Sequence, residues 1–312
     1  PGTETPVQGI DEVKKVANEV GYPIMLKALA GGGGKGMRLV RTEEEVETAL
    51  RLSQSEAGTS FGNDAVYIEK YIENPHHIEV QIMGDKYGNV VHLYERECSI
   101  QRRNQKVIEE SPSPFVKEET RKKMLKVAVE ACKKIGYYSA GTLEFMMDKD
   151  QNFYFLEMNT RLQVEHPVTE ECTGVDLVRD MITVAAGNPL PYKQDDIQFS
   201  GAAIECRIYA EDPENNFIPS PGVITVREAP EGRNLRLDSA AYAGFEVSLH
   251  YDPMIAKLCC WGRTRASAIS NMARALREYK ILGIKTTIPF HQRVLKNAAF
   301  LKGEYDTTFI DT

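Results

Sequence analysis

The spacing of apolar residues predicts alternating helices and strands in the first part of the chain and a strand-rich second part. Helices are predicted at 11–20, 42–56, 118–135, 176–186, 265–279 and 288–295. Strands are predicted at 22–30, 37–41, 65–70, 78–83, 90–95, 141–148, 153–159, 202–209, 222–227, 235–238 and 254–261. The pattern changes after a linker at 189–196. We therefore expect an α+β fold in two blocks that divide near residue 197.

A glycine-rich run, GGGGKG at 31–36, separates the second and third predicted elements. Without Cβ atoms, its backbone N–H groups can approach an anion closely. The run is followed by a strand, whereas a dinucleotide fingerprint needs a helix, and Lys35 is not followed by the Ser or Thr of a Walker loop. These features, with Lys27 on the preceding strand, predict a flap that closes over phosphates.

Two acidic residues are predicted to face each other across a hairpin. A four-residue loop would pair Asp148 with Phe153, and therefore Glu144 with Glu157. Opposed like charges destabilise a sheet by up to ~1 kcal/mol unless something neutralises them. Mg²⁺ does so, and Asn159 on the same face adds a neutral oxygen ligand. The alternative, acids that face solvent on a surface hairpin, fits Asp148 better.

Charged and polar residues follow the second acidic strand. Arg161 can hold a planar oxyanion in a bidentate manner, and Glu165 can act as a base. The upstream polar run at 101–106 is equally consistent with a solvated surface and with a site. His77 and Glu79 alternate on one strand face, as ligands of a nucleotide sugar could.

Composition narrows the choice of function. The chain has 312 residues, 42% of them hydrophobic, and a net charge of -7, which argues against disorder, general nucleic-acid binding and a membrane span. A local cationic cluster for a small anion is still compatible with it. Six scattered cysteines predict free thiols in a reducing, cytoplasmic compartment. The absence of an initiator Met at Pro1 suggests the inside of a longer polypeptide.

Several motifs together resemble those of biotin carboxylases, which are members of the ATP-grasp family. The resemblance covers essentially the whole chain. The motifs are Lys27 with GGGGKGM, EKYIENPHHIEVQ at 69–81, ERECSIQRRNQK at 95–106, GTLEF at 141–145, FLEMNTRLQVEHPVTE at 155–170 and IECRIYAEDP at 204–213. It implies an ATP-grasp fold with a lid subdomain at 1–71, a main subdomain with the metal and bicarbonate site at 72–197, and a biotin carboxylase C-terminal domain at 198–312.

The resemblance also implies an activity and a role for individual residues. ATP phosphorylates bicarbonate to carboxyphosphate, and biotin on a carrier protein is then carboxylated at N1. The implied ATP contacts are Lys27, Gly32, Gly33, Gly34, Met37, Glu69, Lys70, Ile72, His77 and Gln101. Mg²⁺ or Mn²⁺ is held by Glu144, Glu157 and Asn159. The implied bicarbonate site is Arg161, Gln163, Val164 and the base Glu165, with Lys106 beside the anions and Arg207 stabilising the biotin enolate.

The resemblance has two departures. Asn104 stands where many members carry His, and the family's N-terminal domain, with a further ATP-contacting lysine, has no counterpart here. We therefore expect the 312-residue chain alone to be nearly inactive. Expected partners are a biotin carboxyl carrier protein or domain, a carboxyltransferase and a second copy in a homodimer, with no nucleic acid and no membrane. Two alternatives are another ATP-grasp ligase, of the carbamoyl-phosphate synthetase type, and a non-catalytic nucleotide-binding fragment.

Overall fold

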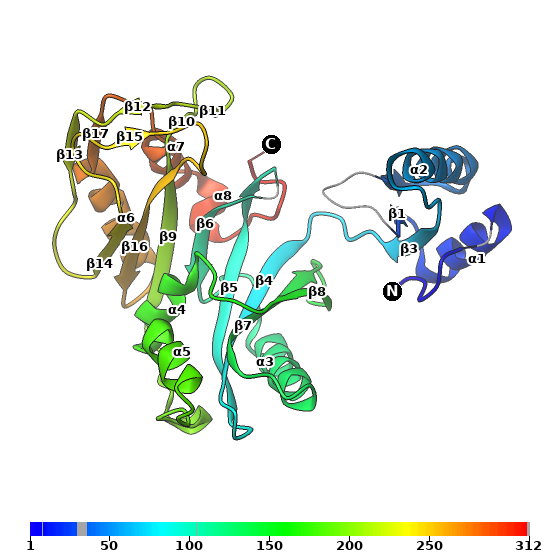
Figure 1. Cartoon of the computed structure of the whole chain (residues 1–312), viewed down its shortest axis with the longest axis horizontal. Helices are drawn as coiled ribbons and strands as arrows, with labels where there is room; N and C mark the ends of the chain where they lie inside the picture. Colours follow the sequence, from blue (N-terminus) through cyan, green and yellow to red (C-terminus); the bar gives the residue numbers. More distant parts are fainter. Residues whose placement is uncertain (8, 30–35, 104, 311–312) are drawn as a thin grey trace. The chain divides into compact units, whose positions relative to one another are not determined.

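The computed structural model describes residues 1–7, 9–29, 36–103 and 105–310. The chain folds into two compact units, Pro1–Glu73 and Asn74–Thr312 (Figure 1). No helix in these described ranges is long and apolar enough to cross a bilayer. All six cysteines are buried and unpaired, as predicted.

The first unit is a three-stranded antiparallel sheet in the order β2-β1-β3 with two helices. Its elements are α1 (Ile10–Val20), β1 (Ile24–Ala28), β2 (Met37–Val40), η1 (Glu43–Glu45), α2 (Val46–Phe61) and β3 (Val66–Lys70). Alternate residues of β1 are buried, so Ile24 and Leu26 pack against both helices. Lys27 therefore lies on the opposite face of the sheet from this core.

The second unit is built on an eight-stranded antiparallel sheet in the order β14-β16-β9-β6-β5-β4-β7-β8. Its strands are β4 (His76–Gly84), β5 (Val90–Arg102), β6 (Gln105–Ser111), β7 (Ser139–Met147), β8 (Phe153–Asn159), β9 (Ala202–Tyr209), β14 (Leu235–Ser239) and β16 (Met254–Gly262). Its helices are α3 (Glu118–Lys134), α4 (His166–Thr173), α5 (Leu177–Ala185), α6 (Arg265–Glu278), α7 (Ile288–Val294) and α8 (Ala298–Lys302), with η2 at Gln194–Asp196. Short strands complete it: β10 (Glu211–Asp212), β11 (Ile218–Pro219), β12 (Gly222–Val223), β13 (Val226–Glu228), β15 (Glu246–Val247) and β17 (Lys280–Leu282).

Separate apolar clusters support different parts of this sheet. Helix α3 packs on β4, β5 and β7, and α6 packs on β9 and β16. The sheet itself continues from β6 to β9 across residue 197, with Glu109 paired to Glu205. The division of the sequence at 197 therefore stays a prediction about its domains, while the contacts divide the chain after Glu73.

The predicted helix–strand alternation and the α+β class are confirmed, but several segments differ from the predictions, among them the following three. In the polar run at 101–106, Gln101 and Arg102 end β5, and Gln105 and Lys106 begin an unpredicted strand, β6. Residues 166–173 form helix α4, an element that was not predicted from the sequence. The strand predicted at 222–227 is divided into β12 and β13.

Candidate active site

The sequence-predicted site residues of the second unit converge on one cleft of about 440 Å³. The sequence-predicted residues that line it are His77, Gln101, Lys106, Glu144, Glu157, Asn159, Arg161, Gln163, Val164, Glu165 and Arg207. Local structure explains part of this convergence, because Gln101 and Lys106 are directly paired across the β5–β6 hairpin. A larger, more apolar cavity of about 510 Å³ lies along residues 238–257. It does not contain these charged groups, so we assign the chemistry to the smaller cleft.

A row of charged residues crosses four strands at the floor of the cleft. Arg96 on β5 pairs with Glu79 on β4, Glu79 with Glu144 on β7, and Glu144 with Glu157 on β8. Side chains directly opposite each other lie about 5 Å apart, so three adjacent carboxylates repel one another. Cations in the cleft must compensate for this repulsion.

Lys106 provides one such cation. Its Nζ contacts Glu79 Oε1 and lies 2.9 Å from Glu144 Oε1 and 2.7 Å from Glu165 Oε1. Burial alone raises the pKa of Glu165, but Lys106, Arg207 and Arg96 outweigh burial and lower it to about 2. Burial likewise raises the pKa of Glu144, while His77 and Lys106 hold it well below its ordinary value. Both carboxyl groups are therefore ionised at neutral pH.

Arg96 is a fully buried guanidinium that positions the base of the cleft. It donates to Glu79 Oε2 at 3.0 Å and to Gln163 Oε1 at 2.8 Å. Gln163 in turn donates from Nε2 to Glu144 Oε1 at 2.8 Å. The orientation of the Gln163 amide is thus fixed from both ends, which prepares it to bind a small ligand.

Arg207 on β9 approaches the same centre from the neighbouring strands. Its Nε lies 2.5 Å from Glu109 Oε1, and its Nη2 lies 3.0 Å from Glu165 Oε2. Burial would lower the pKa of Arg207, but Glu109 and Glu165 raise it well above its ordinary value. The strand has one apolar and one charged face, since Ile204, Cys206 and Ile208 belong to an apolar core and Arg207 points to the other side.

The pairing of Glu144 with Glu157 is confirmed, although the predicted register at the hairpin tip is wrong. Met147, not Asp148, pairs with Phe153, and a bulge at Leu156 shifts the register by one residue before Glu157. Asp148 instead stays in the turn, where its Oδ1 accepts from the backbone N–H groups of Asp150 and Asn152 at 2.9 Å. An Asp side chain that caps its own turn in this way takes the place of a ladder pair.

The residues predicted to bind a metal suit a hard divalent cation. Asn159 Nδ2 lies 3.0 Å from Glu144 Oε1 and 3.3 Å from Glu157 Oε1, so the three side chains share one face. Rotating the amide by half a turn would present its oxygen to the same point. Glu157 is exposed and has no ion pair within the described part of the chain, which leaves its charge free for a cation. All three groups offer the oxygen ligands that Mg²⁺ prefers.

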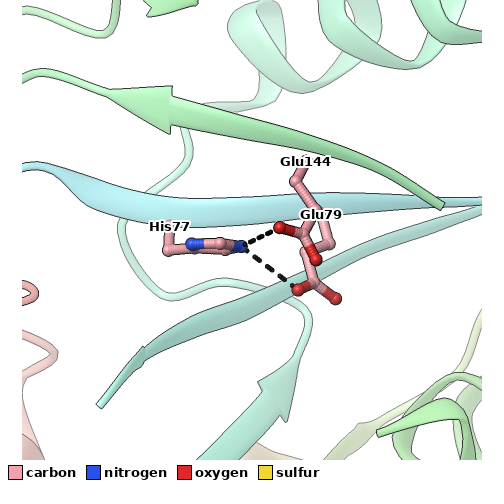
Figure 2. A group of neighbouring side chains, drawn as sticks. All are labelled: His77, Glu79 and Glu144. Atoms are coloured by element: carbon pink, nitrogen blue, oxygen red, sulfur yellow. Dashed lines mark ion pairs between the residues drawn. The ribbon is translucent and has the colours of Figure 1, made fainter. Parts of the chain in front are cut away.

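A second cluster of residues that can bind a metal consists of His77, Glu79 and Glu144, and it shares Glu144 with the first. Figure 2 shows the imidazole of His77 directed at two carboxylates, with Nε2 at 3.2 Å from Glu79 Oε1 and 3.1 Å from Glu144 Oε2. Its ligand atoms are close enough to hold a metal. However, the Lys106 ammonium already contacts both carboxylates, so a metal there would have to compete with it. His77 therefore fits a polar wall of the cleft, with Glu79 buried behind it, better than a metal centre.

The site residues predicted in the first unit lie on its sheet. Lys27 and Met37 are paired at the ends of β1 and β2 that flank the glycine run, and Glu69 and Lys70 end β3. Both Glu69 carboxylate oxygens lie 2.9 Å from Lys27 Nζ, and Lys70 Nζ donates to two backbone carbonyls. Ile72 follows β3 and is half-buried. Gly32, Gly33, Gly34 and Asn104 lie outside the described residues.

Two residues of the centre, Arg96 and Glu109, were not singled out from the sequence, and Glu79 was assigned only a possible sugar contact. The sequence does not show whether a charged residue is buried or solvated, so composition could not identify these residues. The strand register could have identified Arg96 and Glu79, because Arg96, Glu79 and Glu144 are direct neighbours once the order of β5, β4 and β7 is known.

Comparison with known families divides the chain in two. The ATP-binding domain of the carbamoyl-phosphate synthase L chain matches residues 1–193, and the biotin carboxylase C-terminal domain matches residues 205–312. Biotin carboxylase 1 of Bacillus subtilis is 53% identical over 100% of this chain and 70% of its own length. The mouse mitochondrial propionyl-CoA carboxylase alpha chain is 52% identical, and this chain spans 43% of it.

Solved structures show the same relationship. The biotin carboxylase domain of a thermophilic 2-oxoglutarate carboxylase, bound to bicarbonate, has a TM-score of 0.95 at 47% identity, covering 100% of this chain and 68% of that one. The domain dimer from Hydrogenobacter thermophilus, in complex with MgADP, ADP and bicarbonate, has a TM-score of 0.89 at 49% identity, with coverages of 100% and 69%. Biotin carboxylase from Campylobacter jejuni has a TM-score of 0.90 at 50% identity, with the same coverages.

Proposed function

This chain belongs to the biotin carboxylase family and has its ATP-grasp fold, and we propose that it carboxylates biotin with bicarbonate at the expense of ATP. The observation that carries the proposal is the cleft in which Lys106, Glu165 and Arg207 meet beside the Glu144–Glu157 pair. A small anion and a divalent cation can be held side by side there. The relatives named above are biotin carboxylases or carboxylase chains, and the match over residues 205–312 favours biotin over other ATP-grasp substrates.

In the proposed reaction, an oxygen of bicarbonate attacks the γ-phosphorus of ATP and ADP leaves. The resulting carboxyphosphate separates into carbon dioxide and phosphate, the released phosphate takes the proton from N1 of biotin, and N1 then attacks the carbon dioxide. Arg161, Gln163 and the backbone of Val164 would hold bicarbonate. Mg²⁺ held by Glu144, Glu157 and Asn159 would neutralise the phosphate charge.

Glu165 is proposed as the base that takes the bicarbonate proton. A carboxylate with a pKa of about 2 is a weak base, because Lys106 and Arg207 both stabilise its ionised form. Bound anions would draw these two cations away from Glu165 and so raise its pKa. Proton transfer is therefore expected only after both bicarbonate and ATP have bound, which limits hydrolysis of ATP in the absence of bicarbonate.

The partners and the location are further parts of the proposal. We infer that biotin is presented on a carrier protein or domain, that a carboxyltransferase uses the product, and that the intact protein forms a homodimer. The mouse relative is the alpha chain of a propionyl-CoA carboxylase, and the Hydrogenobacter domain is a dimer, which support these partners. Six free buried thiols fit a reducing compartment such as the cytoplasm.

The test is ADP release by the intact protein that carries this chain, with MgATP, bicarbonate and free biotin each supplied or omitted. The proposal predicts release that requires bicarbonate and increases with biotin, together with one carboxybiotin formed per additional ADP. Release that requires ammonia or glutamine instead of biotin would favour a carbamoyl-phosphate type of ligase. Nucleotide binding without release under any condition would favour a non-catalytic module.

A further inference from the structure

Two buried carboxyl groups, in addition to Glu165, lie close to Arg207. Glu109 on β6 and Glu205 on β9 are directly paired in the antiparallel ladder, and each is 0% exposed. Glu109 uses one oxygen, Oε1, to accept from Arg207 Nε at 2.5 Å. Its other oxygen, and both oxygens of Glu205, have no hydrogen-bond partner among the described residues. Three buried acceptor atoms on two directly paired residues thus lack a donor among the described residues.

A second ionised carboxylate cannot be accommodated at this position. Two ionised groups across a ladder repel, and an ionised carboxylate without a partner is among the most costly groups to bury. The groups that face Glu205 are two carboxyl groups, two cations and a thiol, namely Glu109 and Glu165, Arg207 and Lys257, and Cys259. Both cations are already occupied: Arg207 pairs with Glu109 and Glu165, and Lys257 Nζ donates to Val164 O at 2.8 Å.

We propose that Glu109 and Glu205 share one proton, and that this pair is a positioning device that holds Arg207 for the proposed biotin chemistry. The proton resides on Glu205, which has no cation of its own, and Glu109 stays ionised because it contacts Arg207. Burial raises the pKa of both carboxyl groups. At Glu109 the contact with Arg207 opposes this rise, whereas at Glu205 the neighbouring Glu109 adds to it and the pKa is raised well above its ordinary value, so the proton is assigned to Glu205. The shared proton joins Glu109 Oε2 to one oxygen of Glu205, so that only one neutral carbonyl oxygen of Glu205 is left without a partner among the described residues.

The consequence concerns Arg207, the residue expected to stabilise the biotin enolate. Arg207 is held at two nitrogens, with Glu109 at Nε and Glu165 at Nη2. When Glu165 takes up a proton during the reaction, its hold on Arg207 weakens, while Glu109 remains. Glu109 therefore keeps the guanidinium in place at the step where biotin needs it, and Glu205 keeps Glu109 in a single orientation. Neither residue touches the substrate, so both act through Arg207.

The inference rests on the proposed function, and its first test is a ratio of two activities of the intact protein. Glu109→Gln should lower biotin carboxylation roughly tenfold to a hundredfold, the scale expected for losing an outer-shell partner, while bicarbonate-dependent ATP hydrolysis falls less. Glu205→Leu should also lower the ratio of biotin carboxylation to ATP hydrolysis, because it leaves Glu109 without the shared proton. Glu205→Gln keeps an N–H donor and should lose less than Glu205→Leu.

A matched control lies one residue further along β6. Glu110 is also buried, but it pairs with Arg265 at 2.6 Å and contacts Tyr305, away from the cleft. Glu110→Gln makes the same chemical change and should lower the melting temperature without changing the ratio of the two activities. If Glu109→Gln and Glu110→Gln both leave this ratio unchanged, or if Glu205→Gln is worse than Glu205→Leu, the proposal is wrong.

The proton itself can be observed without any turnover. A protonated carboxylic acid gives an infrared C=O band that an ionised carboxylate lacks. This band should lose intensity in Glu205→Gln and keep it in Glu109→Asp at neutral pH. If the acid C=O band keeps its full intensity in Glu205→Gln, Glu205 is ionised and the proposal is overturned. Because this readout needs no biotin, it separates failure of the inference from failure of the proposed function.

Discussion

Replacing Arg207 with alanine is expected to separate the two halves of the proposed reaction. The substitution removes the cation nearest Glu165 on the β9 side, where Nη2 lies 3.0 Å from Glu165 Oε2. Losing one preorganised donor to a developing oxyanion costs a factor of roughly 100 in turnover, or about 2.7 kcal/mol. Biotin carboxylation should fall by this amount, because the enolate charge develops only in the transition state. Lys106 still neutralises the bicarbonate site, so bicarbonate-dependent ATP hydrolysis should fall less.

The same substitution also affects stability, and the assay has to separate the two effects. Glu109 loses its only ion pair within the described chain, and breaking one side of a buried pair costs about 3–5 kcal/mol. Urea unfolding should therefore accompany the kinetics, and Arg207→Lys, which keeps the charge, should fold better and retain more activity. Rates of carboxybiotin formation and of ADP release are compared at saturating MgATP. Equal loss of both rates in a folded variant, or loss of neither, would refute the role assigned to Arg207.

Three further predictions concern the metal, the nucleotide and acid stability. Glu157→Gln on the exposed strand β8 should lower MgATP turnover at least ~100-fold with little change in unfolding, and turnover within a few-fold of wild type would contradict the metal role. Lys27→Met should raise the KM for ATP roughly tenfold in steady-state kinetics. The Lys27–Glu69 ion pair is about half exposed and contributes no more than ~1 kcal/mol to folding, so Lys27→Met should hardly change the stability. An unchanged KM for ATP together with a large loss of stability would contradict the assignment of Lys27 to the nucleotide. Since the pKa of Glu165 is lowered from 4.5 to about 2, its ionisation stabilises the fold above pH 4.5 and this stabilisation is lost as the pH falls toward 2. Urea titrations should show a smaller loss of stability between these pH values for Glu165→Gln than for wild type, and equal losses would contradict the assignment.

The sequence was informative where side-chain patterns reflect local geometry. Strand β9 begins and ends as predicted because its apolar residues alternate with charged ones. The hairpin geometry placed Glu144 opposite Glu157 even though Asp148 stays in the turn, because the bulge at Leu156 compensates for the shorter ladder. That agreement depended on an irregularity which the sequence does not specify, since a bulge is fixed by the packing on both sides of the strand.

The sequence was uninformative where long-range strand order decides the environment of a residue. Strand β6 contains Glu109 and Glu110, and two adjacent acids normally indicate a surface. In the structure β6 lies between β5 and β9, which buries both acids beside arginines that are about 100 or more residues away in sequence. Local propensity could not show these pairs, because each arginine lies on an element that only the tertiary fold brings near.

The central claim is that bicarbonate attacks ATP in the cleft formed by Lys106, Glu165 and Arg207. Oxygen-18-labelled bicarbonate tests it most directly, with the intact protein, MgATP and biotin, and mass spectrometry of the phosphate released. If carboxyphosphate forms and then separates into carbon dioxide and phosphate, one labelled oxygen passes to each phosphate. In wild type the amount of labelled phosphate should follow turnover, and Glu165→Gln should abolish both the labelled phosphate and the turnover. Phosphate that carries no label, while ADP is still released, would show that water attacks ATP and would contradict the account.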